Sequence, residues 1–109
     1  MSTARLLHFI HTPLFDESAD EALGAEGLRL AQVLIQANPE IGRLIQGAGG
    51  ARKMRVGVGG RGTSYGARLV YYYQSSESTV YLLLAYSKTE ADDLTPAGKR
   101  ILRSIIQQL

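Results

Sequence analysis

The residues best suited to chemistry are a group of cations in the central third of the chain. Residues 43–76 hold six Lys and Arg and no Asp or Glu, whereas residues 1–42 carry a net charge of −4 and residues 77–109 balance four cations against four anions. Because a block of like charge repels itself, this distribution indicates a surface that binds a polyanion such as a nucleic acid. The alternative is a solvated face whose acidic partners come from the N-terminal third. The six cations are Arg43, Arg52, Lys53, Arg55, Arg61 and Arg68.

Such cations suit RNA cleavage without a metal. In that reaction the 2′-hydroxyl attacks the adjacent phosphorus, which requires a proton acceptor, charge stabilisation at the phosphate and a proton donor to the leaving 5′-oxygen. Lysine and arginine supply the charge stabilisation, and a neighbouring tyrosine can stack on a base. Composition alone does not choose between a catalytic cluster and one that only binds. The cations expected to converge on two adjacent strands are Lys53, Arg55, Arg61 and Arg68, with Lys88 near the same edge.

Other chemistries find little support in the sequence. The chain has no cysteine, which excludes disulfides, thiol catalysis and cysteine-based metal sites. His8 and His11 stand three residues apart on an expected strand, where they point to opposite faces and make a poor metal pair. Gly57, Gly59 and Gly62 match a dinucleotide-binding pattern, but a strand follows them where that pattern requires a helix. We therefore expect neither a metal nor a small-molecule cofactor.

Length and composition predict a single globular domain over residues 1–109. The chain is 45% hydrophobic and 20% charged, which excludes a disordered tail, a fibrous repeat and a low-complexity segment. No apolar run approaches the roughly 20 residues that a membrane span needs. The first residues show no pattern of a secretory signal. We expect a cytoplasmic protein that does not bind a membrane.

The N-terminal part is expected to form a strand and two helices. Residues 6–10 are apolar enough for a short strand. Thr12 and the proline after it predict an N-cap and the first helical position, and the helix that follows has an apolar face opposite an acidic one. A break at residues 24–27 separates this helix from a second one at residues 28–37. Pro39 predicts its end, because the residue before a proline avoids the helical conformation.

The spacing of apolar residues changes to two after the second helix, which predicts strands. Met54 and Val56 alternate with Lys53 and Arg55, so the two cations are expected to share one exposed face. The three consecutive tyrosines at residues 71–73 also alternate faces, and at least one of them is expected in the core.

Two further strands and a helix complete the predicted fold. Residues 68–74 and 79–86 are rich in β-forming residues, and a polar turn joins them. Thr95, again followed by proline, predicts the start of the last helix, whose apolar stripe runs from Ile101 to Leu109. The order β-α-α-β-β-β-α describes an α+β fold with an antiparallel meander sheet, two N-terminal helices and a C-terminal helix.

Several motifs follow one another along the chain. Residues 38–42 (NPEIG) and 45–55 (IQGAGGARKMR) are similar to the run N-P-x-x-G…I-x-G-T-G-G-L-R-K-x-R. Residues 66–72 (GARLVYY) are similar to G-x-R-[VIL]-[VI]-Y-Y, and residues 86–95 (YSKTEADDLT) to Y-x-K-x-E-x-x-D-L-T. Together these motifs resemble HigB-type toxins of the RelE/ParE superfamily, in the family's order and over nearly the whole chain.

This resemblance implies a RelE-like toxin of a type II toxin–antitoxin system. A toxin of this kind is an endoribonuclease, an mRNA interferase, that inhibits translation by metal-independent and ribosome-dependent cleavage of mRNA. A cognate antitoxin of the helix-turn-helix, HigA-like type neutralises it. By position, the resemblance implies a catalytic role for Lys53, Arg55 and Arg68, and contacts to RNA or the ribosome for Arg52, Arg61 and Lys88. Tyr65 departs from the family pattern, and we expect it to contact RNA by stacking.

The sequence also lacks a cation of the family pattern at three positions. Thr63 and Ser64 stand where loop cations are usual, and Thr89 stands where many relatives carry a further arginine. Each lost cation weakens charge-driven binding to RNA or the ribosome. Two alternatives therefore stay open: a weakened or inactive homologue that acts as an antitoxin-binding module, and a ParE-like inhibitor of DNA gyrase. The retained basic residues argue against the second alternative.

Overall fold

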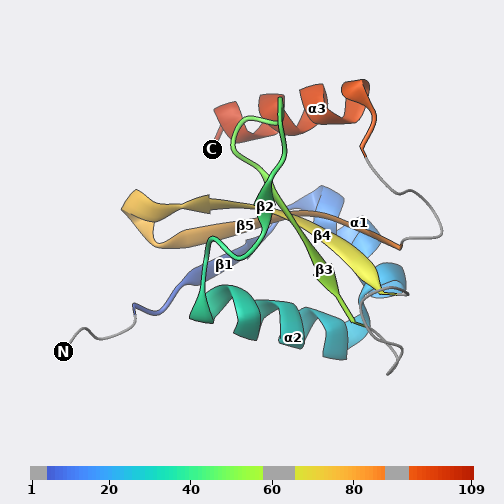
Figure 1. Ribbon diagram of the computed structural model, residues 1–109, viewed down its shortest axis with the longest axis vertical. Coiled ribbons are helices and arrows are strands. Elements are labelled where there is room, and N and C mark those ends of the chain that lie inside the picture. Colours follow the sequence, from blue (N-terminus) through green and yellow to red (C-terminus); the bar gives the residue numbers. More distant parts are fainter. Residues whose placement is uncertain (1–4, 58–65, 88–93) are drawn as a thin grey trace.

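The computed structural model describes residues 5–57, 66–87 and 94–109. The five strands within these ranges are β1 (His8–His11), β2 (Arg43–Leu44), β3 (Arg52–Val56), β4 (Ala67–Gln74) and β5 (Thr79–Ser87). They form one sheet in the order β1-β5-β4-β3-β2, in which β1 runs parallel to β5 and the other neighbours are antiparallel (Figure 1). Because β2 to β5 are neighbours both in the chain and in the sheet, they form the expected meander.

Helices cover both faces of this sheet. α1 (Pro13–Ala22) and α2 (Gly24–Ala37) pack on one face, and α3 (Pro96–Gln107) packs on the other (Figure 1). The two predicted caps are confirmed: the Thr12 and Thr95 hydroxyls accept hydrogen bonds from first-turn N–H groups at 3.2 and 3.0 Å. Each hydroxyl satisfies a backbone donor that the start of a helix leaves unpaired.

The core is divided by the sheet into two clusters. Under α1 and α2, Phe15 and Ile35 pack with inward-facing strand residues, among them the fully buried Tyr71. Under α3, Leu102 packs on the other face of the sheet with Val70. Successive residues of β4 therefore enter opposite clusters, as the period of a strand requires. The expectation that at least one of the three tyrosines is a core residue is confirmed.

The expected order of elements is confirmed, with two differences. The chain adds β2, which pairs with β3 through two residues only and is too short to produce a periodic pattern in the sequence. The break expected at residues 24–27 is wrong, because α2 begins at Gly24. The positive φ of 67° at this glycine turns the chain by itself, and the helix resumes at once.

The surface of α3 is more apolar than its contact with the sheet requires. Leu102 and Ile106 are buried and Ile105 is half-buried, whereas Ile101 remains 57% exposed and Leu109, which follows the end of α3, remains 41% exposed. The apolar stripe expected from the sequence is therefore wider than the part of α3 that the sheet covers. Among the helices of the described ranges, none has the length and apolar character of a membrane span.

Candidate functional site

Four cations from three strands share one face of the sheet. Arg43 on β2 lies opposite Lys53 on β3, and Arg55 on β3 lies opposite Arg68 on β4. Residues that are directly opposite, like residues two apart on one strand, face the same side of a sheet. The structure therefore brings Lys53, Arg55 and Arg68 together on the face that α3 also covers, and adds Arg43 to them.

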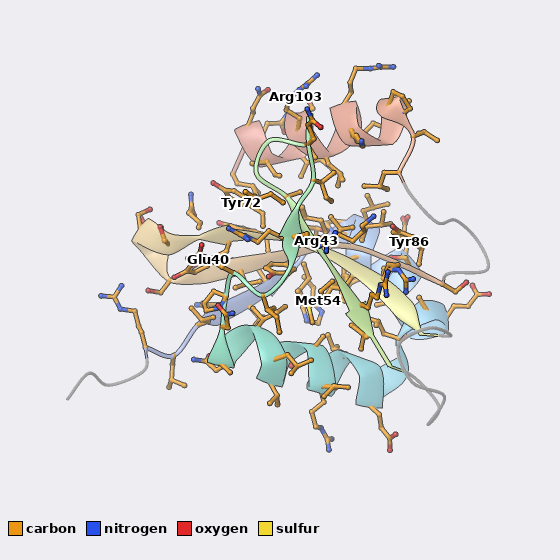
Figure 2. The ribbon with its side chains drawn as sticks, viewed as in Figure 1. Glu40, Arg43, Met54, Tyr72, Tyr86 and Arg103 are labelled. Atoms are coloured by element: carbon orange, nitrogen blue, oxygen red, sulfur yellow. The ribbon has the colours of Figure 1, made fainter. Side chains whose placement is uncertain are left out.

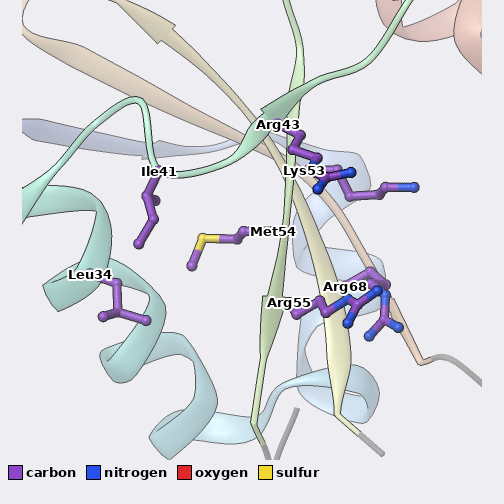
Figure 3. Close-up of a pocket in the computed structure, with 7 residues that line it drawn as sticks. All are labelled: Leu34, Ile41, Arg43, Lys53, Met54, Arg55 and Arg68. Carbon is purple, nitrogen blue, oxygen red and sulfur yellow. The ribbon is translucent and has the colours of Figure 1, made fainter. Parts of the chain in front are cut away.

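The side chains of these four cations line a cavity of about 680 Å³. The rest of its described lining is apolar and consists of Leu34, Ile41 and Met54. In Figure 3 the cations extend to one side of β3, whereas Met54 extends to the other side, toward Ile41 and Leu34. The cavity therefore extends from one side of β3 to the other. It passes around the free edge of this strand, next to the two residues that pair with β2. None of the described residues that line it is acidic.

Arg68 carries its positive charge into a nearly buried position. The residue is 6% exposed, and its Nη1 donates a long hydrogen bond of 3.5 Å to the carbonyl oxygen of Ala67. Within the described ranges, the ion pairs involve other residues and no carboxylate faces this guanidinium. An unpaired buried charge costs free energy, and a phosphate bound beside it would offset that cost through charge-assisted hydrogen bonds.

A bulge in β5 places Tyr86 on the other side of Arg68. The register between β4 and β5 shifts after Val70, where β5 contributes one extra residue, Leu83. Since one extra residue reverses the facing of every residue after it, Tyr86 faces α3 and lies directly opposite Arg68. Figure 2 labels Tyr86 beside the strands of the sheet. Arg55, Arg68 and Tyr86 therefore form one row across three strands.

Sequence reasoning did not place Arg43 or Tyr86 in the site. Arg43 was one of the six central cations, but a two-residue strand leaves no pattern that would show which way its side chain points. Tyr86 ends a run of apolar residues in which a bulge is invisible, and strict alternation would have placed it under α1 and α2. In both cases, the facing of the side chain depends on the register in which the strands pair, and the sequence does not show this register.

Arg52 lies on the opposite face of β3 and is bound within the protein. Its Nη2 forms an ion pair with Oε2 of Glu40 at 3.3 Å, and its Nη1 donates to the carbonyl oxygens of Gly42 at 2.8 Å and Glu40 at 3.3 Å. Because successive residues of a strand face opposite sides, Arg52 does not share the face of Lys53. This geometry counts against the RNA-binding role expected for Arg52.

Tyr71 fixes the turn that leads into β2. Its hydroxyl donates a hydrogen bond to the carbonyl oxygen of Pro39 at 2.8 Å and accepts one from the N–H of Gly42 at 2.9 Å. Burial raises the pKa of the Tyr71 phenol, against the opposing effects of the Gly42 N–H and the Arg52 charge. The neutral phenol holds a turn that ends directly at Arg43.

Several expected site residues lie outside the part of the chain that the structure describes. They belong to residues 58–65 and 88–93, and their roles stay predictions from the sequence. The residues concerned are Arg61, Tyr65 and Lys88, together with the departures Thr63, Ser64 and Thr89.

The two histidines lie at the opposite edge of the sheet from β2. Both belong to β1, where Nδ1 of His11 contacts Oδ1 of Asp16 at 3.3 Å and its ring meets Phe15 edge to face. In the described ranges, no group of three or more His, Cys, Asp or Glu side chains is arranged to hold a metal ion. Among the described residues that line the cavity, the side chains that can donate hydrogen bonds to a phosphate are those of Lys and Arg.

No family model matches the chain. Two solved structures have the same architecture: a double mutant of the E. coli toxin RelE in the free state, and the isolated E. coli RelE toxin. The first has a TM-score of 0.57 at 20% sequence identity, over 88% of this chain and 98% of that one. The second has a TM-score of 0.54 at 18% identity, over 92% and 99% of the two chains. The chain has the RelE fold.

The two matches cover 88% and 92% of this chain and 98% and 99% of the RelE chains. The RelE-like fold that the motifs implied is thereby confirmed. In this example of the RelE fold, the meander and the short β2 bring Arg43, Lys53, Arg55 and Arg68 to one face, and the bulge in β5 brings Tyr86 to the same face.

Proposed function

We propose that this protein is the toxin of a type II toxin–antitoxin system, of the HigB-like branch of the RelE/ParE superfamily. In this proposal it is an endoribonuclease that inhibits translation by cleaving mRNA, without a metal and on the ribosome. The observation that carries the proposal is the nearly buried guanidinium of Arg68 beside Arg55 and Lys53, in a cavity whose described lining holds no acid. The RelE fold and the motifs around these three residues support it.

The cations act together on one transfer step. The 2′-hydroxyl loses its proton to solvent water and its oxygen bonds to phosphorus, while the bond from phosphorus to the 5′-oxygen breaks and that oxygen takes up a proton from water. This leaves a 2′,3′-cyclic phosphate and a 5′-hydroxyl. Arg68 stabilises the charge that grows on the phosphate oxygens in the transition state. Lys53 or Arg55, which follow one another on the same face of β3, assists the 2′-hydroxyl and anchors the phosphate.

The proposed partners follow from this activity. They are mRNA, the ribosome and a cognate antitoxin of the helix-turn-helix, HigA-like type. The proposed place of action is the cytoplasm. Arg61, Tyr65 and Lys88 enter the proposal from the sequence alone, as further contacts to RNA or the ribosome.

Primer extension along a reporter message, after brief induction in cells, tests the proposal. We expect codon-phased cleavage and growth arrest with the wild type, and intact message with Arg68→Ala, whose fold is checked by circular dichroism. Arg29→Ala is a matched control, because Arg29 is exposed on α2 and lines a separate hollow with Phe9 and Val33. Undiminished cleavage by Arg68→Ala would refute the assignment.

Two other outcomes correspond to the alternatives left open by the sequence. Intact message and normal growth with soluble, folded wild-type protein would indicate an antitoxin-binding module without nuclease activity. Intact message combined with inhibition of DNA supercoiling by purified gyrase would indicate a ParE-like inhibitor.

A further inference from the structure

One wall of the cavity is apolar. It lies on the opposite side of β3 from the cations. Met54 from β3 is 7% exposed, Ile41 from the turn before β2 is 41% exposed, and Leu34 from α2 is half-buried. These three residues, here called the apolar wall, gather on one side of β3 in Figure 3. Their side chains carry no N–H or O–H group. The apolar wall therefore offers contact area without a directional hydrogen bond.

A nucleotide, like the cavity, has a charged part and a part with an apolar surface. Its phosphate is anionic and requires cations, whereas its base has two flat faces that gain free energy by leaving water against an apolar or aromatic surface. The cations and the apolar wall line one continuous cavity, so a single ligand can reach both. A phosphate alone would leave the exposed Ile41 uncovered.

We propose that the apolar wall is a nucleobase subsite, which holds the base next to a phosphate bound by Arg43, Lys53 and Arg55. This inference rests on the proposed function, which supplies RNA as the ligand. Aliphatic side chains contact the face of a base and not its hydrogen-bonding edges. The subsite therefore selects by contact area, preferring a purine to a pyrimidine, and its side chains do not distinguish adenine from guanine.

An apolar side chain of a partner protein is the other occupant that such a wall would accept. Charge complementarity favours the nucleotide, because four cations lie in the same cavity and none of its described lining residues is acidic. A ligand that fills the cavity must bring negative charge to one side of β3 and an apolar surface to the other. Each nucleotide of an RNA strand does both.

Binding of short single strands to the purified full chain tests the subsite. The probes are non-cleavable 2′-O-methyl oligoadenylate and oligouridylate, and an abasic strand of the same length and charge, followed by fluorescence anisotropy at low salt. We expect the wild type to bind oligoadenylate about tenfold more tightly than the abasic strand, with oligouridylate between them. Ile41→Ser should reduce this preference to about twofold and leave the affinity for the abasic strand unchanged.

Val33→Ser is the matched control, because Val33 is a 59% exposed aliphatic residue of α2 that lines the separate hollow. It should retain the tenfold preference. Equal binding of all three strands by the wild type, or an unchanged preference in Ile41→Ser, would overturn the subsite and leave the proposed function standing. Failure of every strand to bind, with no effect of Arg68→Ala, would count against the proposed function as well.

Discussion

Arg55 and Arg68 lie directly opposite each other across β3 and β4, so two positive side chains occupy adjacent positions on one face of the sheet. Like charges in this arrangement are destabilising by about 0.2–1 kcal/mol. Arg68 is also nearly buried, which adds the cost of taking a charge out of water. An arrangement that opposes folding is expected where the pair serves a ligand, since the negative charge of a bound phosphate offsets the repulsion between the two side chains.

Replacing Arg68 by methionine should separate stability from activity. Arg68→Met keeps much of the side-chain volume and removes both the buried charge and its repulsion from Arg55. We therefore expect the free energy of unfolding to stay equal or to rise by about 1 kcal/mol, while RNA cleavage and toxicity are lost. Urea denaturation and a growth assay measure the two effects. A variant that is destabilised by several kcal/mol would show that Arg68 serves the fold.

The salt dependence of RNA binding should report how many cations contact phosphate. Lys53→Gln and Arg43→Gln should each lower the slope of log K against log salt by about 0.7 for a single-stranded RNA, because one fewer counterion is displaced. Arg29→Gln, outside the cavity, should leave the slope unchanged. Titrations at four or more salt concentrations measure the slope. Equal slopes in all three variants would show that the cavity does not hold the RNA backbone.

Removing the Tyr71 hydroxyl should destabilise the protein at neutral pH. Tyr71→Phe leaves the Gly42 N–H and the Pro39 carbonyl oxygen without their hydrogen bonds, which costs about 1–3 kcal/mol. Because the pKa of Tyr71 is raised above its usual 10.0, the folded state holds this proton more tightly than the unfolded state. The resulting stability is present below pH 10.0 and is lost as pH rises through the raised pKa.

The difference in unfolding free energy between wild type and Tyr71→Phe should therefore shrink above pH 10.0. Denaturation curves of both proteins at neutral and alkaline pH measure it. A difference that stays constant up to the highest accessible pH would contradict the hydrogen-bonded, neutral phenol.

A side chain at Gly66 should disrupt the start of β4. A Cβ at this position would overlap the carbonyl oxygen of Val56, which belongs to the backbone of the neighbouring strand and cannot move without breaking the pairing of β3 and β4. We expect Gly66→Ala to lower the free energy of unfolding by about 3 kcal/mol. Gly98→Ala is the control, because its Cβ would make an ordinary contact of 3.4 Å with Thr95 Oγ1 and alanine favours a helix by up to about 1 kcal/mol. Equal melting temperatures for the two variants would contradict this packing.

Most elements of the fold were predictable because their signals are local. The Thr12 and Thr95 caps act within one helical turn, and the alternation of Met54 and Val56 with Lys53 and Arg55 needs only the geometry of one strand. The same local geometry explains why Lys53 and Arg55 share a face. The break expected at residues 24–27 is wrong because Gly24, with its positive φ, turns the chain within a single residue instead of four.

The site was predictable only in part, because its assembly depends on pairings between distant residues. The sequence by itself determined that cations would gather in the middle of the chain, that Lys53 and Arg55 would point the same way, and that an α+β meander would carry them. Tertiary structure alone decided that Arg43 joins them through a two-residue strand and that Arg52 is bound to Glu40 on the other face. It also decided that a one-residue shift in β5 turns Tyr86 toward Arg68. Strand register is set by packing across the whole sheet, and a shift of one residue reverses which face a side chain occupies.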